Sequence, residues 1–185
     1  MSTYTIGIII GSLRKESFNR KLAQALMKLA PGQLDCEIIP IADVPLYNQD
    51  NDSNPPAAII ALKKAVASKD GIIFVTPEYN RAIPGVLKNV IDTASRPYGD
   101  NSWAGKAAGI VGTSPGAIGT AVAQQQLRSC ISGFLDMPTL GQPEVYLQFK
   151  DDLIDDNGDI GNDKTREFLQ KWMDTYAAWV AKIAG

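Results

Sequence analysis

The chain has 185 residues, of which 45% are hydrophobic and 21% are charged, and its formal net charge is -2. These values are typical of one globular domain spanning residues 1–185, and they argue against disordered, collagen-like and coiled-coil chains. The nearly balanced charge gives no broad positive field, so we expect neither nucleic acid nor an anionic membrane surface as the main partner. The sequence contains no histidine, which excludes Ser-His and Cys-His nucleophile pairs and the commonest zinc sites.

The sequence carries no sign of export or membrane insertion. No apolar run approaches the roughly 18 residues of a spanning helix, and the first residues lack the charged and apolar segments of a signal peptide. We therefore expect a cytoplasmic protein. Cys36 and Cys130 have neither metal-site spacing nor the density of a disulfide framework, so we expect both to be reduced, mostly buried thiols.

Short apolar runs alternate with helix-like segments along the whole chain. The runs, each ended by turn residues, predict strands at 4–10, 36–41, 71–76, 107–113 and, more weakly, 138–147. Apolar residues three or four positions apart predict helices at 19–29, 56–68, 84–94, 120–134 and 163–184. Strands that alternate with helices in this way indicate a parallel sheet covered on both faces.

Five strand–helix units in a chain of this length predict an α/β fold of the flavodoxin-like type. This fold is a three-layer sandwich whose five-stranded parallel sheet has the strand order 2-1-3-4-5. In such a sheet the ligand binds beyond the carboxyl ends of the strands, near the point where the strand order reverses. The loops that follow the first, third and fourth strands are therefore the candidate binding loops.

Two polar segments lie outside the strand–helix pattern. Residues 48–56 are rich in turn-forming residues, which indicates a surface loop. Residues 150–163 are acidic and superficially similar to a calcium-binding loop, but they lack the Glu at its twelfth position. We therefore expect an exposed hairpin or lid edge there, and no metal site.

The loop after the first predicted strand carries groups that suit a phosphate monoester. Unpaired backbone N–H groups and the helix dipole attract a dianion to the start of a helix. Ser12, Ser17 and Asn19 add hydroxyl and amide donors, and Arg14 or Arg20 can pair with the charge. Ser17 could instead be only the N-cap of the helix, with the cations merely solvated. We favour anion binding because a cap needs one such side chain and this turn supplies several.

The loops after the third and fourth strands offer groups for a flat ligand. Pro77, Glu78, Tyr79 and Asn80 form a stiff turn with an aromatic ring and successive backbone amides. The stretch 112–120 has three glycines, which let the backbone approach a ligand closely. Either loop taken alone could be a plain turn, but both fall at the same sheet edge as the first. Because the first loop lacks the Walker and dinucleotide glycine patterns, a mononucleotide is the expected ligand.

Two of these loops resemble those of the NADPH-dependent FMN reductase family. The stretch GSLRKESFNRKLA resembles its Gly-Ser-x-Arg-x-x-Ser-x-Asn phosphate loop, and PEYN followed by PGVLKNVID resembles its flavin loop. The similarity covers about residues 4–135 and is closest to the bacterial quinone and chromate reductases of the family. The chain departs from the family pattern at Arg81, where a more neutral residue is expected, at Thr93, where an aromatic is frequent, and at Thr120, where glycine is expected.

The resemblance implies FMN as the cofactor, with its phosphate in the first loop and its isoalloxazine ring against the second. Ser114 would contact the flavin or its ribityl chain. The residues that the resemblance implies as cofactor contacts are Ser12, Leu13, Arg14, Lys15, Glu16, Ser17, Phe18, Asn19, Pro77, Glu78, Tyr79, Asn80 and Ser114.

The resemblance further implies an FMN-dependent oxidoreductase that passes hydride from NADPH or NADH to quinones, and also to chromate or free flavin. The cofactor would carry the chemistry, so no catalytic side chain is expected, in agreement with the missing histidine. The resemblance also implies a homodimer or homotetramer with flavin sites near the subunit boundary, and Arg96, Tyr98 and Trp103 are the expected interface residues.

Two other functions fit the same fold. A flavodoxin-type electron carrier would bind FMN without oxidising NAD(P)H, but such carriers usually have a strongly acidic face and the net charge here is only -2. A phosphoacceptor signalling domain would need an Asp at the end of the third strand, where this chain has Thr76 and Pro77.

Overall fold

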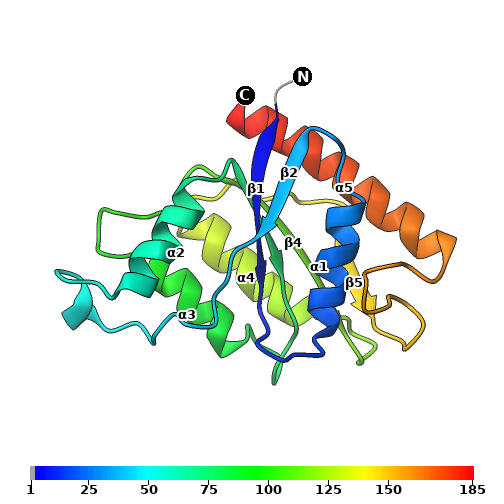
Figure 1. Cartoon of the computed structure of the whole chain (residues 1–185), viewed down its shortest axis with the longest axis horizontal. Coiled ribbons are helices and arrows are strands. Elements are labelled where there is room, and N and C mark those ends of the chain that lie inside the picture. Colours follow the sequence, from blue (N-terminus) through cyan, green and yellow to red (C-terminus); the bar gives the residue numbers. More distant parts are fainter. Residues whose placement is uncertain (1–2) are drawn as a thin grey trace.

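The structure, a computed structural model that describes residues 3–185, has a central sheet between two layers of helices (Figure 1). Its strands are β1 (Tyr4–Ile10), β2 (Leu34–Ile38), β3 (Gly71–Val75), β4 (Ala107–Ser114) and β5 (Val145–Gln148). All neighbouring strands are parallel, and their order is β2-β1-β3-β4-β5. The predicted fold class and strand order are confirmed.

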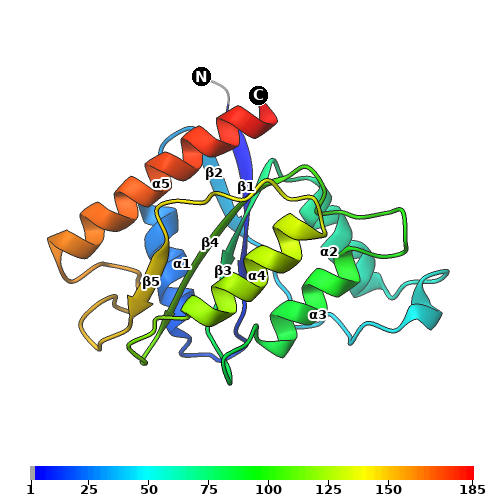
Figure 2. The same cartoon turned by 180° about the vertical axis from the view of Figure 1, so that it is seen from behind.

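The helices cover both faces of this sheet. They are α1 (Phe18–Lys28), α2 (Ala57–Ala67), α3 (Gly85–Ala94), α4 (Ala121–Gly133) and α5 (Asp163–Ala184), and a short 3-10 helix, η1, spans Gln49–Asn51. Helices α1 and α5 pack on one face, and α2, α3 and α4 pack on the other (Figures 1 and 2). No helix within residues 3–185 is both long and apolar enough to cross a membrane.

The apolar run at residues 6–10 of β1, where every residue is buried, reflects its central place in the sheet. Successive side chains of a strand point to opposite faces, so a strand covered on both sides must be apolar at every position. Ile8 packs in the core beneath α1 and α5, and its neighbour Ile9 packs in the core beneath α2, α3 and α4. Both side chains are fully buried.

Two strands are shifted from their predicted bounds. The sequence predicts strands at 36–41 and 138–147, whereas β2 ends before Pro40 and β5 begins only after Pro143. A proline has no N–H to donate to a sheet ladder, so both boundaries fall beside a residue that cannot continue the pairing.

The acidic segment at 150–163 forms the expected hairpin. Ile154 and Ile160 make an antiparallel bridge, which closes its two sides. The hairpin lies against α1, where Lys21 Nζ is 2.6 Å from a carboxylate oxygen of Asp156.

Trp103 does not lie where the sequence-based interpretation placed it. Its side chain is fully buried, and its indole N–H donates to the carbonyl oxygen of Ile91 at 2.9 Å. The expectation that Trp103 lies at a subunit interface is therefore wrong, because the ring belongs to the core beneath α2, α3 and α4. Tyr98, by contrast, is 92% exposed.

A glycine in β4 lets α5 dock on the sheet. The rings of Trp172 and Tyr176 stack with centroids 5.4 Å apart and an interplanar angle of 4°. A Cβ atom at Gly109 would lie 2.8 Å from the Trp172 ring and 2.9 Å from the Tyr176 ring, closer than real Cβ contacts allow. The missing side chain is therefore what admits both aromatic rings.

We expect Gly109→Ala to lower the free energy of unfolding by about 1–3 kcal/mol, because the extra methyl group overpacks the interface with α5. Urea denaturation of the purified variant measures this change. Gly133→Ala is the matched control, since an added Cβ there meets nothing within 4 Å. Equal stability of the two variants would contradict the close-packing interpretation.

Candidate functional site

Three loops meet at the carboxyl ends of the strands, at the lower edge of the sheet in Figure 1. They follow β1, β3 and β4 and are called the first, second and third loops. The cleft between them is lined by Ser12, Arg14, Ser17, Phe18, Asn19, Pro77, Glu78, Tyr79, Thr113, Ser114 and Pro115. Its volume of about 140 Å³ is below the roughly 300–1,000 Å³ of sites that enclose a small ligand. A ligand bound here would therefore be only partly enclosed by this chain.

The first loop leaves the sheet directly beside the second. The N–H of Gly11 donates to the carbonyl oxygen of Val75 at 2.9 Å, which continues the pairing of β1 with β3 by one step. A Cβ atom at Gly11 would lie 3.1 Å from the Leu87 side chain and 3.3 Å from Pro77. The glycine therefore lets the two loops start in close contact.

The first loop presents hydrogen-bond donors that no protein group uses. Ser12 and Ser17 are buried, and their hydroxyl oxygens accept from the backbone N–H groups of Arg14 and Arg20, each at 3.3 Å. Within residues 3–185, neither hydroxyl donates to a protein acceptor, and the N–H groups of Lys15, Glu16 and Phe18 also lack one.

These free donors lie at the amino terminus of α1, whose dipole favours negative charge, and Arg14 also lines the cleft. Buried polar groups are almost always paired, so the unused hydroxyl protons of the buried Ser12 and Ser17 indicate a missing acceptor, whereas Lys15 and Glu16 are exposed to water. A phosphate dianion supplies acceptor oxygens and charge together. The donor set of this structure therefore fits a phosphate group.

Asn19 joins the first and third loops. Its side-chain amide pairs with the backbone of Thr113 in both directions: Oδ1 accepts from the N–H at 3.1 Å, and Nδ2 donates to the carbonyl oxygen at 2.9 Å. Asn19 is 2% exposed, so both hydrogen bonds are shielded from water. This contact leaves the amide with a single free N–H for a ligand. The sequence gives no signal for it, because the partners are 94 positions apart.

The second loop is a strained hairpin. Tyr79 and Ala82 exchange two backbone hydrogen bonds, of 3.3 and 3.0 Å. The two residues between them, Asn80 and Arg81, have φ angles of 52° and 62°. This is a two-residue turn of the primed type, whose second position is normally glycine. An L-residue with a side chain such as Arg81 has a cost of about 1–2 kcal/mol in this left-handed conformation.

Contacts with α4 hold this hairpin in place. The Glu78 side chain is 6% exposed, and its Oε2 accepts from the N–H of Ala123 at 3.0 Å, in the first turn of α4. A carboxylate at this position is stabilised by the helix dipole. Gln126, also on α4, binds the backbone of the hairpin. Its side-chain amide donates to the Arg81 carbonyl oxygen at 3.0 Å and accepts from the Ile83 N–H at 3.3 Å.

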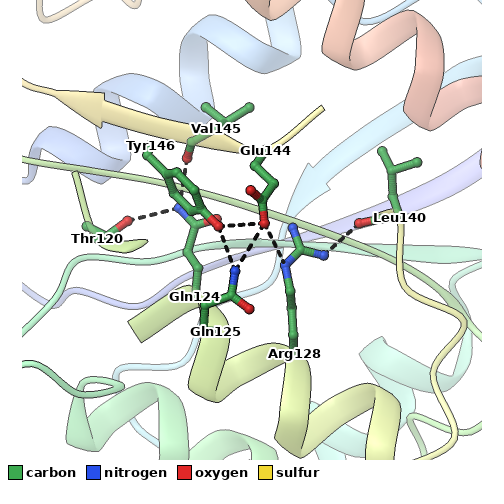
Figure 3. Close-up of polar contacts among 8 residues, drawn as sticks. All are labelled: Thr120, Gln124, Gln125, Arg128, Leu140, Glu144, Val145 and Tyr146. Atoms are coloured by element: carbon green, nitrogen blue, oxygen red, sulfur yellow. Dashed lines mark hydrogen bonds and ion pairs between the residues drawn. The ribbon is translucent and has the colours of Figure 1, made fainter. Parts of the chain in front are cut away.

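The third loop ends in a closely packed turn that is tied to β5. Thr120, with a φ of 74°, precedes α4, and its hydroxyl oxygen accepts from the fully buried Gln124 side chain at 2.9 Å (Figure 3). The same nitrogen of Gln124 donates to the Val145 carbonyl oxygen at 2.7 Å. A side chain at Gly112 would collide with the Thr120 hydroxyl, so close approach of β4 to this turn requires glycine.

A second set of contacts fixes α4 to the segment around β5. Gln125 donates to Glu144 Oε1 at 3.0 Å and to Tyr146 Oη at 2.8 Å, and the Tyr146 hydroxyl donates to Glu144 Oε1 at 2.6 Å (Figure 3). Burial and the hydrogen bond to Glu144 raise the pKa of Tyr146, so the hydroxyl keeps its proton. The helix that holds Glu78 is therefore itself anchored to the sheet.

Most of the expected contact residues line the cleft, but four do not. These are Leu13, Lys15, Glu16 and Asn80. Leu13 is 55% exposed. Of the two arginines considered for the phosphate, Arg14 lines the cleft, whereas Arg20 lines a separate pocket beside Lys21.

Sequence reasoning missed two residues of the cleft, Thr113 and Pro115. They flank Ser114, so the stretch 112–120 identified the right loop but not these lining residues. The two cysteines lie outside the cleft. Both are free and only partly buried, whereas mostly buried thiols were expected. Burial raises the pKa of Cys36 to about 11 and also raises the pKa of Cys130, so both thiols stay protonated near neutral pH.

Comparison with known proteins identifies the family of the chain. A family model described as NADPH-dependent FMN reductase matches residues 4–152. A 2-hydroxy-1,4-benzoquinone reductase of Burkholderia sp is 50% identical over 175 residues, which is 95% of each chain. A quinone reductase of Pseudomonas putida is 48% identical over 178 residues, 96% of this chain and 95% of that protein. The solved structure of a flavoenzyme NAD(P)H:(acceptor) oxidoreductase from Paracoccus denitrificans superposes with a TM-score of 0.94 at 40% identity, covering 99% of this chain and all of that one.

We expect Arg81→Gly to raise the free energy of unfolding of the ligand-free protein by about 0.5–1 kcal/mol, because glycine adopts the positive φ of this turn without strain. Thermal or urea unfolding measures the change. Gly32→Ala serves as a reference for an exposed site without a steric contact. A clear loss of stability in Arg81→Gly would show that the arginine side chain supports the hairpin, contrary to our interpretation.

Proposed function

Because the chain belongs to the NADPH-dependent FMN reductase family, we propose that it is an enzyme that uses FMN to transfer electrons from NAD(P)H to quinones. FMN as the cofactor and NAD(P)H as the electron donor come with membership of this family. The observation that carries the proposal is the pair of buried serine hydroxyls, Ser12 and Ser17, whose protons no protein group accepts within residues 3–185, in a cleft formed by three loops.

In this proposal the first loop holds the FMN phosphate. Ser12 and Ser17 would donate their hydroxyl protons, Arg14 would balance the charge, and the free N–H groups at the start of α1 would supply further donors. These groups together are called the phosphate cradle. Asn19 has mainly a positioning role, because its amide holds the Thr113 backbone at the base of the third loop.

The second and third loops would border the flavin ring. Tyr79 is 50% exposed at the cleft, and the backbone of residues 77–80 is held rigid by the hairpin and by Glu78. Backbone donors fixed in this way stabilise developing negative charge without reorganisation. When bound, FMN supplies the hydride chemistry for which this chain has no side chain.

Quinones are the proposed acceptors, and 2-hydroxy-1,4-benzoquinone is one of them, since the Burkholderia relative is named for it. Chromate and free flavin are proposed as further acceptors on the family resemblance alone. The cytoplasm is the proposed location, in keeping with the sequence.

We also propose that the active form is a homodimer or homotetramer. Two large aromatic side chains are strongly exposed, Tyr98 at 92% and Phe134 at 82%. Both line a groove of about 830 Å³ between the carboxyl end of α3 and α4. Exposed aromatic residues around a groove are typical of protein interfaces.

We expect the FMN-loaded protein to oxidise NADPH or NADH steadily in the presence of 1,4-benzoquinone, with initial rates that show double-displacement kinetics. Steady-state absorbance at the reduced nicotinamide band measures this activity. A protein that binds FMN tightly but oxidises neither nucleotide would instead be an electron carrier of the flavodoxin type.

We expect Ser17→Asp to weaken FMN binding by at least about tenfold while leaving the fold intact. Asp caps a helix as well as Ser does, but its charge opposes a phosphate at the same place. Fluorescence titration with FMN measures the affinity, and circular dichroism checks the helix. Asn162→Asp, at the amino-terminal cap of α5, is the matched control and is expected to bind FMN normally. Unchanged binding by Ser17→Asp would leave Ser17 as a helix cap only.

A further inference from the structure

Arg81 is a positively charged residue near the cleft, at a turn position that does not favour its backbone conformation. Arg81 occupies the turn position where glycine is normal, at a φ of 62°. Arg81 does not itself line the cleft, but its Nη1 lies 3.3 Å from Oε1 of Glu78, which does, and it follows Tyr79 by two residues in the same hairpin. The side chain is 65% exposed.

The guanidinium group of Arg81 makes few contacts with other protein groups. Oε2 of the Glu78 carboxylate accepts from the Ala123 N–H at the positive end of α4, and Arg81 adds only a long contact of 3.3 Å to Oε1. Within residues 3–185, that carboxylate is the single acceptor for the Arg81 side chain, and a guanidinium group has five N–H donors. Most of its hydrogen-bonding capacity is therefore free.

Arg14, the cation that lines the cleft, lies in a different loop. Arg14 lies in the first loop, where its guanidinium group stands 5.2 Å from the centre of the Phe18 ring and beside the free donors of the phosphate cradle. Arg14 and Glu78 are the charged residues among those that line the cleft. Arg81 thus adds a positive charge on the side of the second loop, away from the phosphate.

Quinones that carry a hydroxyl group on the ring have the matching chemistry. Such a hydroxyl is conjugated with a ring carbonyl through a C=C bond, so the quinone is a vinylogous carboxylic acid. The hydroxyl therefore loses its proton readily. The anion is planar and shares its charge among the ring oxygens. An arginine side chain pairs with such oxygens and also stacks on flat rings, whereas a neutral quinone offers it only weak acceptors.

We propose that Arg81 is a specificity-determining residue that selects acidic quinones, with the anion of 2-hydroxy-1,4-benzoquinone as the representative substrate. This inference rests on the quinone reductase function proposed above. The anion, NAD(P)H and two protons give NAD(P)+ and benzene-1,2,4-triol, so two electrons pass from the nicotinamide to the quinone. The triol is uncharged near neutral pH. Arg81 therefore attracts the substrate and not the product, which favours release after each turnover.

The test compares two quinones that differ by one hydroxyl group. With FMN-loaded enzyme and saturating NADPH, we expect Arg81→Gln to lower kcat/KM for 2-hydroxy-1,4-benzoquinone about five- to tenfold, the range between an exposed ion pair and a charge-assisted hydrogen bond. The value for 1,4-benzoquinone should stay within about twofold. Gln has the same backbone strain as Arg at this turn, so the variant isolates the charge. Arg81→Lys should retain most of the activity.

Two further measurements separate charge recognition from other effects. Added salt should lower the wild-type kcat/KM for the hydroxyquinone and leave that of Arg81→Gln nearly unchanged, because salt screens exposed charges. Lys171→Gln, which removes an exposed cation on α5, is the matched control and should behave as wild type.

Several outcomes would overturn the proposal. Equal losses with both quinones would mean that Arg81 only shapes the hairpin, and no loss with either would mean that its charge is unused. A slower reduction by NADPH but not by NADH, followed without any quinone, would assign the charge to the 2′-phosphate of the donor. Failure of the wild-type enzyme to reduce either quinone would instead refute the quinone reductase function itself.

Discussion

The paired hydrogen bonds between the Asn19 side chain and the Thr113 backbone set the geometry on which the candidate site depends. A parallel sheet brings the carboxyl ends of its strands to one edge, but it does not fix how the loops beyond them approach one another. The Asn19 amide joins the start of α1 to the end of β4 across the intervening space. Because the contact is buried, breaking it would leave a polar backbone pair without partners in a dry environment. The free donors of the first loop are thereby held beside the third loop.

The second loop is held by different means, and its local conformation is unfavourable. Asn80 and Arg81 both have positive φ angles, as does Thr120 at the end of the third loop. Such residues persist when surrounding contacts determine the backbone, and they occur most often at functional sites. Here Glu78 and Gln126 link the hairpin to α4, which is in turn linked to β5. Three of the four non-glycine residues with positive φ among residues 3–185 lie in these loops, and the fourth, Asp136, follows α4. The sheet itself follows the ordinary rules of patterning.

The strands, the helices and the two covering layers could be predicted from hydrophobic periodicity and turn residues, both of which are local signals. The strand order came from the usual order of the flavodoxin-like fold, and the carboxyl edge, where the cleft lies, was expected from the general rule for such sheets. The boundaries of β2 and β5 were less accurate, because they depend on which backbone groups find a partner in the sheet. The buried place of Trp103 and the pairing of Asn19 with Thr113 were not predicted, since each depends on contacts between distant parts of the chain. Ser17 could be identified either as a helix cap or as a phosphate ligand, and the structure gives its hydroxyl the capping contact together with a free proton to donate.

The central claim is that this chain builds one flavin site whose first loop is a phosphate cradle. The most direct measurement is a comparison of the affinities of the cofactor-free protein for FMN and for riboflavin, which lacks the phosphate, by fluorescence titration under identical conditions. We expect riboflavin to bind at least about tenfold more weakly, because the charge-assisted hydrogen bonds of the first loop would have no partner. Equal affinities for the two flavins would contradict the claim.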